Sequence, residues 1–240
     1  MKEIQTIFSY LGGSHAYGLN NKDSDVDERG IFVNTEPSKI YGLETHEHQE
    51  NKETDTFYME LRKFLKLLQK GNTQATEALF VTDHILKTTD DFKYIQENKM
   101  QLLGSETLYK TLRGYIQGEK SLIIGHPLGK FLGEKRKTAI TQYGYSYRNA
   151  VHAIRLLRCG ILFFTTDKYP VNILREDLIF GDMMKDIKNN PQNHKVNDLL
   201  DLISTLEVTL NKAFEERSIN HVFNMDCAVE ICRRSYKKYL

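Results

Sequence analysis

Residues 12–33 read GGSHAYGLNNKDSDVDERGIFV and separate two short, largely apolar runs of the chain. The first run, residues 7–11, ends at a glycine pair, and the second, residues 31–33, follows a cluster of acidic side chains. Glycine permits tight turns, whereas β-branched and aromatic residues favour strands. The pattern predicts a strand over residues 4–11, a short helical turn over 14–19 and a second strand over 25–33.

Two carboxylates at the start of the second predicted strand are the first candidates for a functional site. Residues i and i+2 of an extended chain share a face, so Asp25 and Asp27 are expected to project together while Val26 turns into the core. Paired carboxylates form a hard oxygen site that suits Mg²⁺ or Mn²⁺. Without a cation, their repulsion would raise the pKa of one of them. We therefore predict that both are metal ligands.

The glycine pair upstream predicts a phosphate-binding turn. Gly12 and Gly13 allow the backbone to approach a ligand closely, and the amides near Ser14 can point at phosphate oxygens. A Gly-Gly-Ser turn by itself is most often only a turn, and an isolated Asp-x-Asp is most often part of a solvated loop. Their occurrence in this order, between two apolar runs, favours a phosphate cradle close to a metal site.

The same residues carry a resemblance to a known superfamily. Gly13-Ser14, ten further residues and then Asp25-Val26-Asp27 resemble the signature of the DNA polymerase β-like nucleotidyltransferases. The longer pattern, in which Ser24 precedes the acidic pair, is similar to the RNA-repair-associated branch called RlaP-like. The resemblance implies that Gly13, Ser14 and Ser24 contact the nucleotide. It also implies a third carboxylate on a later strand that completes the metal site.

Asp55 is the candidate for this third carboxylate. Residues 52–58 have the composition of a strand and residues 59–70 carry apolar side chains at helical spacing, so we expect Asp55 near the end of a strand just before a helix. A helix cap or a surface acid is the structural alternative. Glu53, on the same face of the strand, competes for the metal role. His46 and His48 lie in a polar stretch, residues 44–52, that we predict to be a solvated loop.

Length, composition and charge limit the class of protein. The 240 residues, 40% of them apolar and 27% charged, suffice for one large or two small globular domains. With 33 basic and 32 acidic side chains the net charge is +1, so a nucleic-acid partner would need a local basic patch. Three cysteines without a close pair, no signal peptide and no long apolar run predict a reduced, soluble, cytoplasmic protein with no membrane partner.

Beyond about residue 103 the apolar spacing is helical almost throughout. Helices are predicted near residues 105–124, 138–166, 173–188, 195–217 and 221–238. Residues 125–130 imitate a P-loop, but they have too few residues between the glycines and no Ser or Thr after the lysine, so we predict a turn. We divide the chain into a catalytic domain, residues 1–102, and a helical substrate-binding domain, residues 103–240.

A second group of candidate residues lies on the predicted helix 138–166. Arg148, His152 and Arg155 follow at i, i+4 and i+7 and therefore share one helix face. The face is either a solvated stripe with a histidine against the core, or a cationic wall that grips the triphosphate across a cleft from the carboxylates. A similar arrangement in the RlaP-like family favours the second interpretation. On this interpretation Arg148, His152 and Arg155 each contact the nucleotide. The neighbouring basic residues 135–137 are predicted to be solvated surface.

Together these features predict an α/β (α+β) fold, with a small mixed sheet of the nucleotidyltransferase type followed by an α-helical domain. The resemblance implies a two-metal enzyme in which Asp25, Asp27 and Asp55 are catalytic metal ligands. It would transfer a nucleoside monophosphate from an NTP, expected to be ATP, to an acceptor hydroxyl, expected at an RNA or tRNA 3′ end. A protein-modifying (AMPylating) enzyme and a catalytically silent, antitoxin-like binding module are the alternatives. The sequence leaves open the nucleotide base, the acceptor, the oligomeric state and the effect of His15, where relatives often have arginine.

Overall fold

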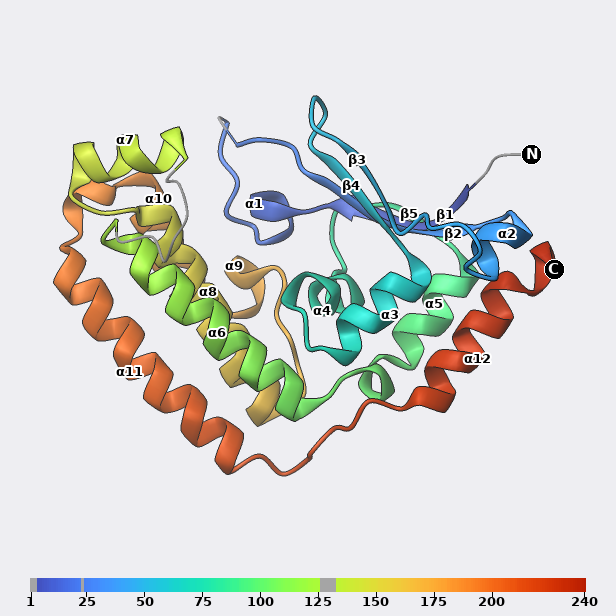
Figure 1. The fold of residues 1–240 in the computed structure, drawn as a ribbon. Coiled ribbons are helices and arrows are strands. Elements are labelled where there is room, and N and C mark those ends of the chain that lie inside the picture. The colour runs from blue at the N-terminus through green and yellow to red at the C-terminus, as the bar shows by residue number, and fades with distance from the viewer. Residues whose placement is uncertain (1–3, 23, 126–132) are drawn as a thin grey trace. The chain divides into compact units, whose positions relative to one another are not determined.

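The computed structural model describes residues 4–22, 24–125 and 133–240. Contacts between residues divide the chain into two compact units (Figure 1). The described residues of Met1–Leu108 and Asn220–Leu240 form the first, the sheet unit, and those of Tyr109–Ile219 form the second, the helical unit. The sheet unit therefore includes the C-terminal helix, which the sequence analysis assigns to the helical domain.

The sheet unit is built on a mixed sheet of five strands in the order β3-β4-β2-β1-β5. Strands β2 and β4 are parallel, whereas the other neighbouring pairs are antiparallel. The predicted α/β class with a small mixed sheet is confirmed. The strands are β1 (Ile4–Leu11), β2 (Glu28–Asn34), β3 (His48–Asn51), β4 (Thr56–Glu60) and β5 (Ile85–Thr88).

Two predicted strands and one predicted loop differ from the observed structure. The second strand begins at Glu28 rather than at residue 25, and β4 begins at Thr56 rather than at residue 52. The polar stretch 44–52, predicted to be a loop, contains β3, whose four residues are all exposed. A short edge strand pairs through its backbone and can keep polar side chains in water, so its pattern lacks an apolar face. Residues 52–55 form the turn between β3 and β4.

Three helices cover one face of the sheet: α3 (Leu61–Gln69), α5 (Asp90–Glu97) and α12 (Met225–Tyr236) (Figure 1). Phe8 of β1 stacks on Phe92 of α5 with ring centroids 3.8 Å apart, and Phe64 of α3 lies 6.3 Å from the Phe92 ring. All three rings are fully buried. The remaining elements of the unit are α1 (Gly13–Ala16), α2 (Pro37–Ile40), α4 (Thr73–Phe80), η1 (Lys99–Leu102) and η3 (Lys237–Tyr239).

One buried carboxylate, Glu60, explains why the C-terminal helix belongs to this unit. Glu60 caps α3 by accepting hydrogen bonds from the amides of Arg62 (2.9 Å) and Lys63 (3.4 Å). It also accepts a hydrogen bond from the hydroxyl of Tyr236 at the end of α12. Because a buried charge is stable only with such partners, α12 is held to the sheet unit by chemistry that apolar spacing does not reveal.

The helical unit is organised around α8 (Tyr147–Thr166), most of which is buried. Helix α8 contacts α10 (Leu178–Asn189) and α11 (Val196–Glu215). At Gly160 of α8 a Cβ atom would lie 2.7 Å from Leu210 Cδ1 and 2.8 Å from Leu112 Cδ1, so glycine permits the close packing with α11 and α6 (Ser105–Ile123). The remaining elements are α7 (Glu134–Tyr143), α9 (Ile173–Glu176) and η2 (Pro191–Asn193).

Two predicted helices are each interrupted. Gly144 has a φ of +78° and ends α7, so the predicted helix 138–166 is two helices. The predicted helix 173–188 is likewise divided at Asp177 into α9 and α10. The apolar residues kept helical spacing across both breaks, because the helices on either side of each break bury their apolar faces in the same unit. The sequence pattern therefore did not reveal the breaks. The turn predicted at 125–130 lies outside the described residues apart from Gly125. Within the described ranges, no helix is long and apolar enough to cross a membrane.

Candidate active site

The parallel pair of strands brings two acidic residues together. Glu28 at the start of β2 is the partner of Thr56 at the start of β4. Asp27 and Asp55, which precede these residues, therefore lie next to each other, and the Glu28 amide donates to the Asp55 carbonyl oxygen at 3.1 Å. Asp55 has a φ of +45°, in the left-handed region, where the turn after β3 ends. The register of one strand pair thus assembles two carboxylates that are distant in the sequence.

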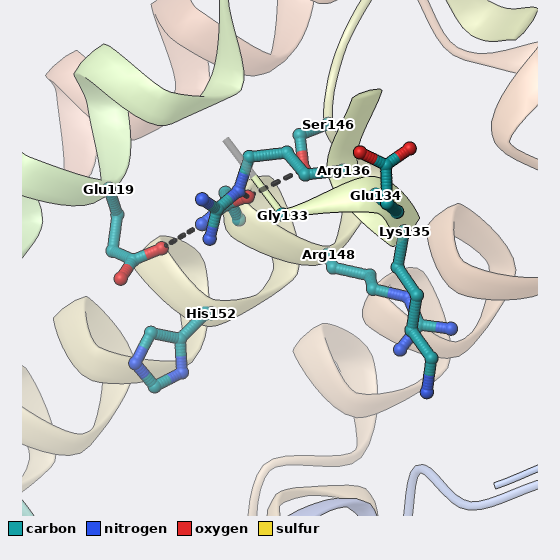
Figure 2. Close-up of a pocket in the computed structure, with 9 residues that line it drawn as sticks. Glu119, Gly133, Glu134, Lys135, Arg136, Ser146, Arg148 and His152 are labelled. Atoms are coloured by element: carbon teal, nitrogen blue, oxygen red, sulfur yellow. Dashed lines mark hydrogen bonds between the residues drawn. The ribbon is translucent and has the colours of Figure 1, made fainter. Parts of the chain in front are cut away.

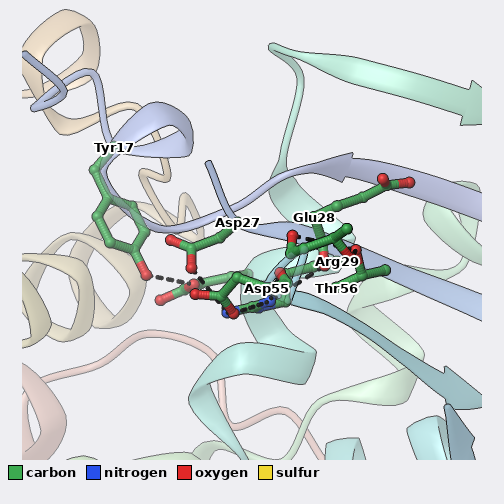
Figure 3. A network of polar contacts seen from close by, with 8 residues as sticks. Tyr17, Asp27, Glu28, Arg29, Asp55 and Thr56 are labelled. Carbon is green, nitrogen blue, oxygen red and sulfur yellow. Dashed lines mark hydrogen bonds and ion pairs between the residues drawn. The ribbon is translucent and has the colours of Figure 1, made fainter. Parts of the chain in front are cut away.

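Arg29 of β2 binds both carboxylates (Figure 3). Its Nη2 lies 3.1 Å from Asp27 Oδ1 and 3.2 Å from Asp55 Oδ1, while its Nη1 donates to the Asp55 carbonyl oxygen at 2.8 Å. The guanidinium is therefore an internal counter-ion of the acidic pair. Sequence analysis missed Arg29, although its position two residues after Asp27 places it on the same side of an extended chain.

The two carboxyl groups perturb each other. The pKa of Asp27 rises from 3.8 to about 6. Burial is the largest cause of this rise, the hydrogen bond with Asp55 is the second, and the charge of Arg29 opposes it. The pKa of Asp55 is lowered, mainly by its hydrogen bond with Asp27 and further by Arg29. The negative charge of Asp25 also raises the pKa of Asp27. The pair therefore shares a proton at mildly acidic pH and concentrates negative charge above it.

The loop before β2 does not have the predicted strand geometry. Asp25 and Val26 precede the strand, and Val26 is 55% exposed, so its predicted place in the core is wrong. Strand alternation does not apply to Val26 because β2 begins only at Glu28. Asp25 is exposed as well. Across the residues that the structure describes, no three His, Cys, Asp or Glu side chains are arranged to hold a metal ion. The structure joins two of the three predicted ligands, Asp27 and Asp55, through Arg29, and the charge of exposed Asp25 acts on both.

The donor atoms of this pair fit a divalent cation. Carboxylate oxygens are the ligands that Mg²⁺ and Mn²⁺ prefer. The position between Asp27 and Asp55 already attracts a cationic group, the Arg29 guanidinium. A metal ion bound by both carboxylates would take the place of this ion pair, so Arg29 would have to turn aside. The metal site itself stays a prediction.

The glycine pair packs directly against these charged groups. Gly13 has a φ of +55°, and a Cβ atom on it would lie 2.1 Å from Asp27 Oδ2. A Cβ atom on Gly12 would lie 2.7 Å from Arg29 Cγ, and the Gly12 amide donates to the Asp27 carbonyl oxygen at 2.7 Å. Any side chain at either position would displace the acidic pair or its counter-ion. The turn thus lies beside the carboxylates, where the sequence predicts a phosphate cradle.

The two serines predicted to contact the nucleotide have different surroundings. Ser14 is half-buried in α1, next to Gly13. Ser24 closes a turn, because its hydroxyl accepts from the Asn21 amide at 2.9 Å and donates to Asn21 Oδ1 at 3.0 Å. A nucleotide contact stays a prediction for both serines, and Ser24 would make it at the expense of this turn.

A buried carboxylate of α4 positions the glycine turn. The hydroxyl of Tyr17, which directly follows α1, donates to Glu77 Oε2 at 3.1 Å (Figure 3). Glu77 is 4% exposed. The hydrogen bond links the end of the turn to a helix from another part of the chain. Sequence analysis assigned no role to either residue, because no local pattern indicates that they meet.

The structure also separates Asp55 from its competitor. Glu53 is exposed in the turn between β3 and β4, where its amide donates to Asn51 Oδ1 at 2.9 Å. Asp55 is the acidic residue that reaches Asp27. However, Asp55 precedes β4, so its predicted place at the end of a strand just before a helix is wrong; α3 begins only at Leu61. The error arose because the strand was placed too early.

In the helical unit, the three predicted nucleotide contacts differ in exposure. Arg148 is exposed in the first turn of α8. Arg155 is 1% exposed, and its Nη2 lies 3.5 Å from His152 Nδ1. The pKa of His152 is lowered to about 3, mainly by burial and further by the charge of Arg155. A continuous cationic wall is therefore not formed, because the neighbouring helices bury most of α8. A nucleotide contact stays a prediction for all three residues.

Comparison with known proteins identifies the family. The mixed sheet, with a glycine turn beside paired carboxylates, agrees with the class predicted from the sequence, a polymerase β-like nucleotidyltransferase. A family model described as RlaP, RNA repair pathway DNA polymerase beta family, matches residues 1–165. The chain belongs to the RlaP family, and membership points to a nucleotidyltransferase. Searches of curated proteins and of solved structures found no match.

Proposed function

We propose that this protein transfers a nucleoside monophosphate from ATP to the 3′-hydroxyl of an RNA, such as a broken RNA or a tRNA. The observation that supports transfer is the register of β2 and β4, which unites Asp27 and Asp55 beside the Gly13 turn. The family description, which names an RNA repair pathway, supports RNA as the acceptor.

In the proposed reaction the acceptor hydroxyl releases its proton to solvent and its oxygen attacks the α-phosphorus. The bond between the α-phosphorus and the oxygen that bridges to the β-phosphate breaks, and pyrophosphate leaves. Mg²⁺ or Mn²⁺, held by Asp27 and Asp55 with Asp25 as the third ligand, would lower the pKa of the attacking hydroxyl and neutralise charge on the triphosphate. Above about pH 6 both Asp27 and Asp55 are ionised and can act as ligands. Such catalysis depends on positioning and charge, so no dedicated general base is needed.

The remaining residues of the site bind and orient the triphosphate. Gly13 has no Cβ atom, so the backbone of its turn can approach a phosphate group closely, and its amides can point at phosphate oxygens. The Ser14 hydroxyl, on the same turn, can donate to a phosphate oxygen. Arg29 neutralises the acidic pair before the substrate binds, and its guanidinium can then turn to a phosphate oxygen.

The test is a labelling experiment with the purified protein. Each α-labelled nucleoside triphosphate is incubated with Mg²⁺ and either total RNA or host protein extract. We expect label from ATP on RNA, lost in the Asp27→Asn variant and retained in the Glu53→Gln variant, which removes an exposed acid from the neighbouring turn. Label on a polypeptide would support the AMPylating alternative instead. Label on neither fraction would support the silent module.

A further inference from the structure

The helical unit contains a pocket that the proposed catalytic chemistry does not use (Figure 2). Its volume is about 590 Å³, within the range of small-molecule sites. It is lined by the N-terminal ends of α7 and α8 together with one residue of α6. The residues that matter for its chemistry are Glu119, Lys135, Arg136, Arg148, Asn149 and His152.

Positive charge predominates at one end of the pocket. Lys135 and Arg148 are exposed, and Figure 2 shows both side chains extending in the same direction, away from Glu119 and His152. The acidic neighbour Glu134 is paired with Lys137 at 2.9 Å. No carboxylate binds Arg148 in the described part of the chain; its guanidinium lies 5.8 Å from the centre of the Tyr147 ring. This end therefore carries two exposed cationic side chains, and charge-assisted hydrogen bonds from such groups bind anions.

The backbone adds to this field. Helices α7 and α8 both begin at the pocket, and among the residues that the structure describes no side chain caps either N-terminus. Helix N-termini carry a partial positive charge, and their first amides can bind anionic oxygens. Two such ends and two cationic side chains around one cavity are suited to a phosphate group.

The other end of the pocket is lined by hydrogen-bonded polar groups. Asn149 Nδ2 donates to Glu119 Oε2 at 2.5 Å, while Asn149 Oδ1 accepts from Arg136 Nε at 3.0 Å and from the Ser146 hydroxyl at 2.5 Å. Burial raises the pKa of Glu119 and keeps His152 neutral at physiological pH. The Glu119 carboxyl and the neutral His152 ring can form hydrogen bonds with a sugar hydroxyl or a base edge.

We propose that this pocket binds one phosphorylated nucleotide, with its phosphate between Lys135 and Arg148 and its nucleoside against Glu119 and His152. The choice of a nucleotide over other phosphate esters rests on the proposed function. The ligand is either a free nucleotide or the phosphorylated end of an RNA, which share this chemistry. His152 and Arg155 then have separate tasks: the neutral ring faces the ligand, and the buried guanidinium supports the ring from within.

The test measures binding by the full-length protein, in EDTA, of three phosphorylated probes: inorganic phosphate, adenosine 5′-monophosphate and a short oligoribonucleotide with a 5′-phosphate. Adenosine and the 5′-hydroxyl oligoribonucleotide are their unphosphorylated counterparts. Because one charge-assisted contact is lost, Arg148→Gln should weaken binding of the phosphorylated probes about tenfold or more. Lys168→Gln, which removes a charge beyond the far end of α8, roughly 30 Å away, should change it less than twofold.

The active-site variant Asp27→Asn separates this proposal from the proposed function. Phosphate-dependent binding should persist in Asp27→Asn, even if the labelling experiment detects no transfer with any acceptor. Stronger binding of the oligoribonucleotide than of the mononucleotide would identify an RNA end as the ligand, and the reverse would identify a free nucleotide. Equal binding of phosphorylated and unphosphorylated probes would overturn the proposal. So would equal losses in Arg148→Gln and Lys168→Gln, which would indicate diffuse surface attraction.

Discussion

Replacement of Asp27 by asparagine should stabilise the fold while it removes the metal site. The carboxyl of Asp27 is 20% exposed, and its pKa rises from 3.8 to about 6 on folding. A rise of this size corresponds to about 3 kcal/mol. Contact with solvent reduces the effect, so we expect about 1–2 kcal/mol. Asparagine has nearly the same shape, carries no charge, and can donate a hydrogen bond to Asp55 at every pH.

The sign of the pH dependence follows from proton binding. Between about pH 4 and pH 6 the folded protein holds a proton on Asp27 that the unfolded chain releases, so this group lowers stability as the pH rises through that window. The full destabilisation is present above about pH 6. Asp27→Asn removes this destabilisation. The free energy of unfolding of the variant should therefore exceed that of the wild type most at pH 8 and less at pH 4.5.

Thermal unfolding followed by circular dichroism, in EDTA, measures the difference. For a chain of this length 1–2 kcal/mol corresponds to a rise in Tm of about 3–6 °C at pH 8. Addition of Mg²⁺ or Mn²⁺ should raise the Tm of the wild type, because the ion binds only the folded state, and should leave the variant unchanged. The matched control Glu53→Gln, in the exposed turn, should lie within about 0.5 kcal/mol of the wild type.

An Asp27→Asn variant that melts at or below the wild-type temperature at pH 8 in EDTA would refute this reasoning. It would mean that Arg29 already neutralises the pair completely, so that the acidic groups impose no cost on the fold. A metal-induced rise in Tm that persists in the variant would remove Asp27 from the ligand set.

Three further perturbations test separate parts of the structure. Asp55→Ala should lower turnover about a hundredfold or more, whereas Glu53→Ala should have little effect; steady-state kinetics that reverse this order would reject the β2–β4 register as the basis of the site. Gly13→Ala should abolish transfer and lower the free energy of unfolding in urea by about 1–3 kcal/mol, because residue 13 has a positive φ and its Cβ would collide with the Asp27 carboxylate. The control Gly114→Ala, in the middle of α6 with open space around it, should instead stabilise the protein by about 0.5–1 kcal/mol. Tyr236→Phe should cost about 1–3 kcal/mol, because the buried carboxylate that caps α3 loses its partner on α12; an unchanged urea midpoint would show that α12 is held by apolar packing alone.

Local patterns in the sequence were sufficient for the first strand, the glycine turn and most of the helices. Strand β1, the turn at Gly13 and helix α3 depend on residues only a few positions apart, so composition and spacing predict them. The choice of glycine at position 13 also follows from the sequence, since a tight turn beside a ligand favours it. Errors occurred where polar residues form an edge strand or where a short break interrupts a continuous apolar face.

The membership of Asp27 and Asp55 in one site could be expected only from the family resemblance. No local pattern joins them, because their contact depends on the pairing of β2 with β4 across a crossover. The same register selects Asp55 over Glu53 and introduces Arg29 as the counter-ion, a role that sequence analysis missed.

The sequence by itself determined which chemical groups are available: the glycine turn, the acidic residues and the basic residues of α8. The tertiary structure alone decided which of these groups meet and which carry charge. Arg148 is in water while Arg155, two turns along the same helix, is enclosed, and burial makes His152 a neutral ring. The physical reason is that helical spacing specifies a face of α8, but the desolvation that sets charge and pKa depends on the helices that cover that face.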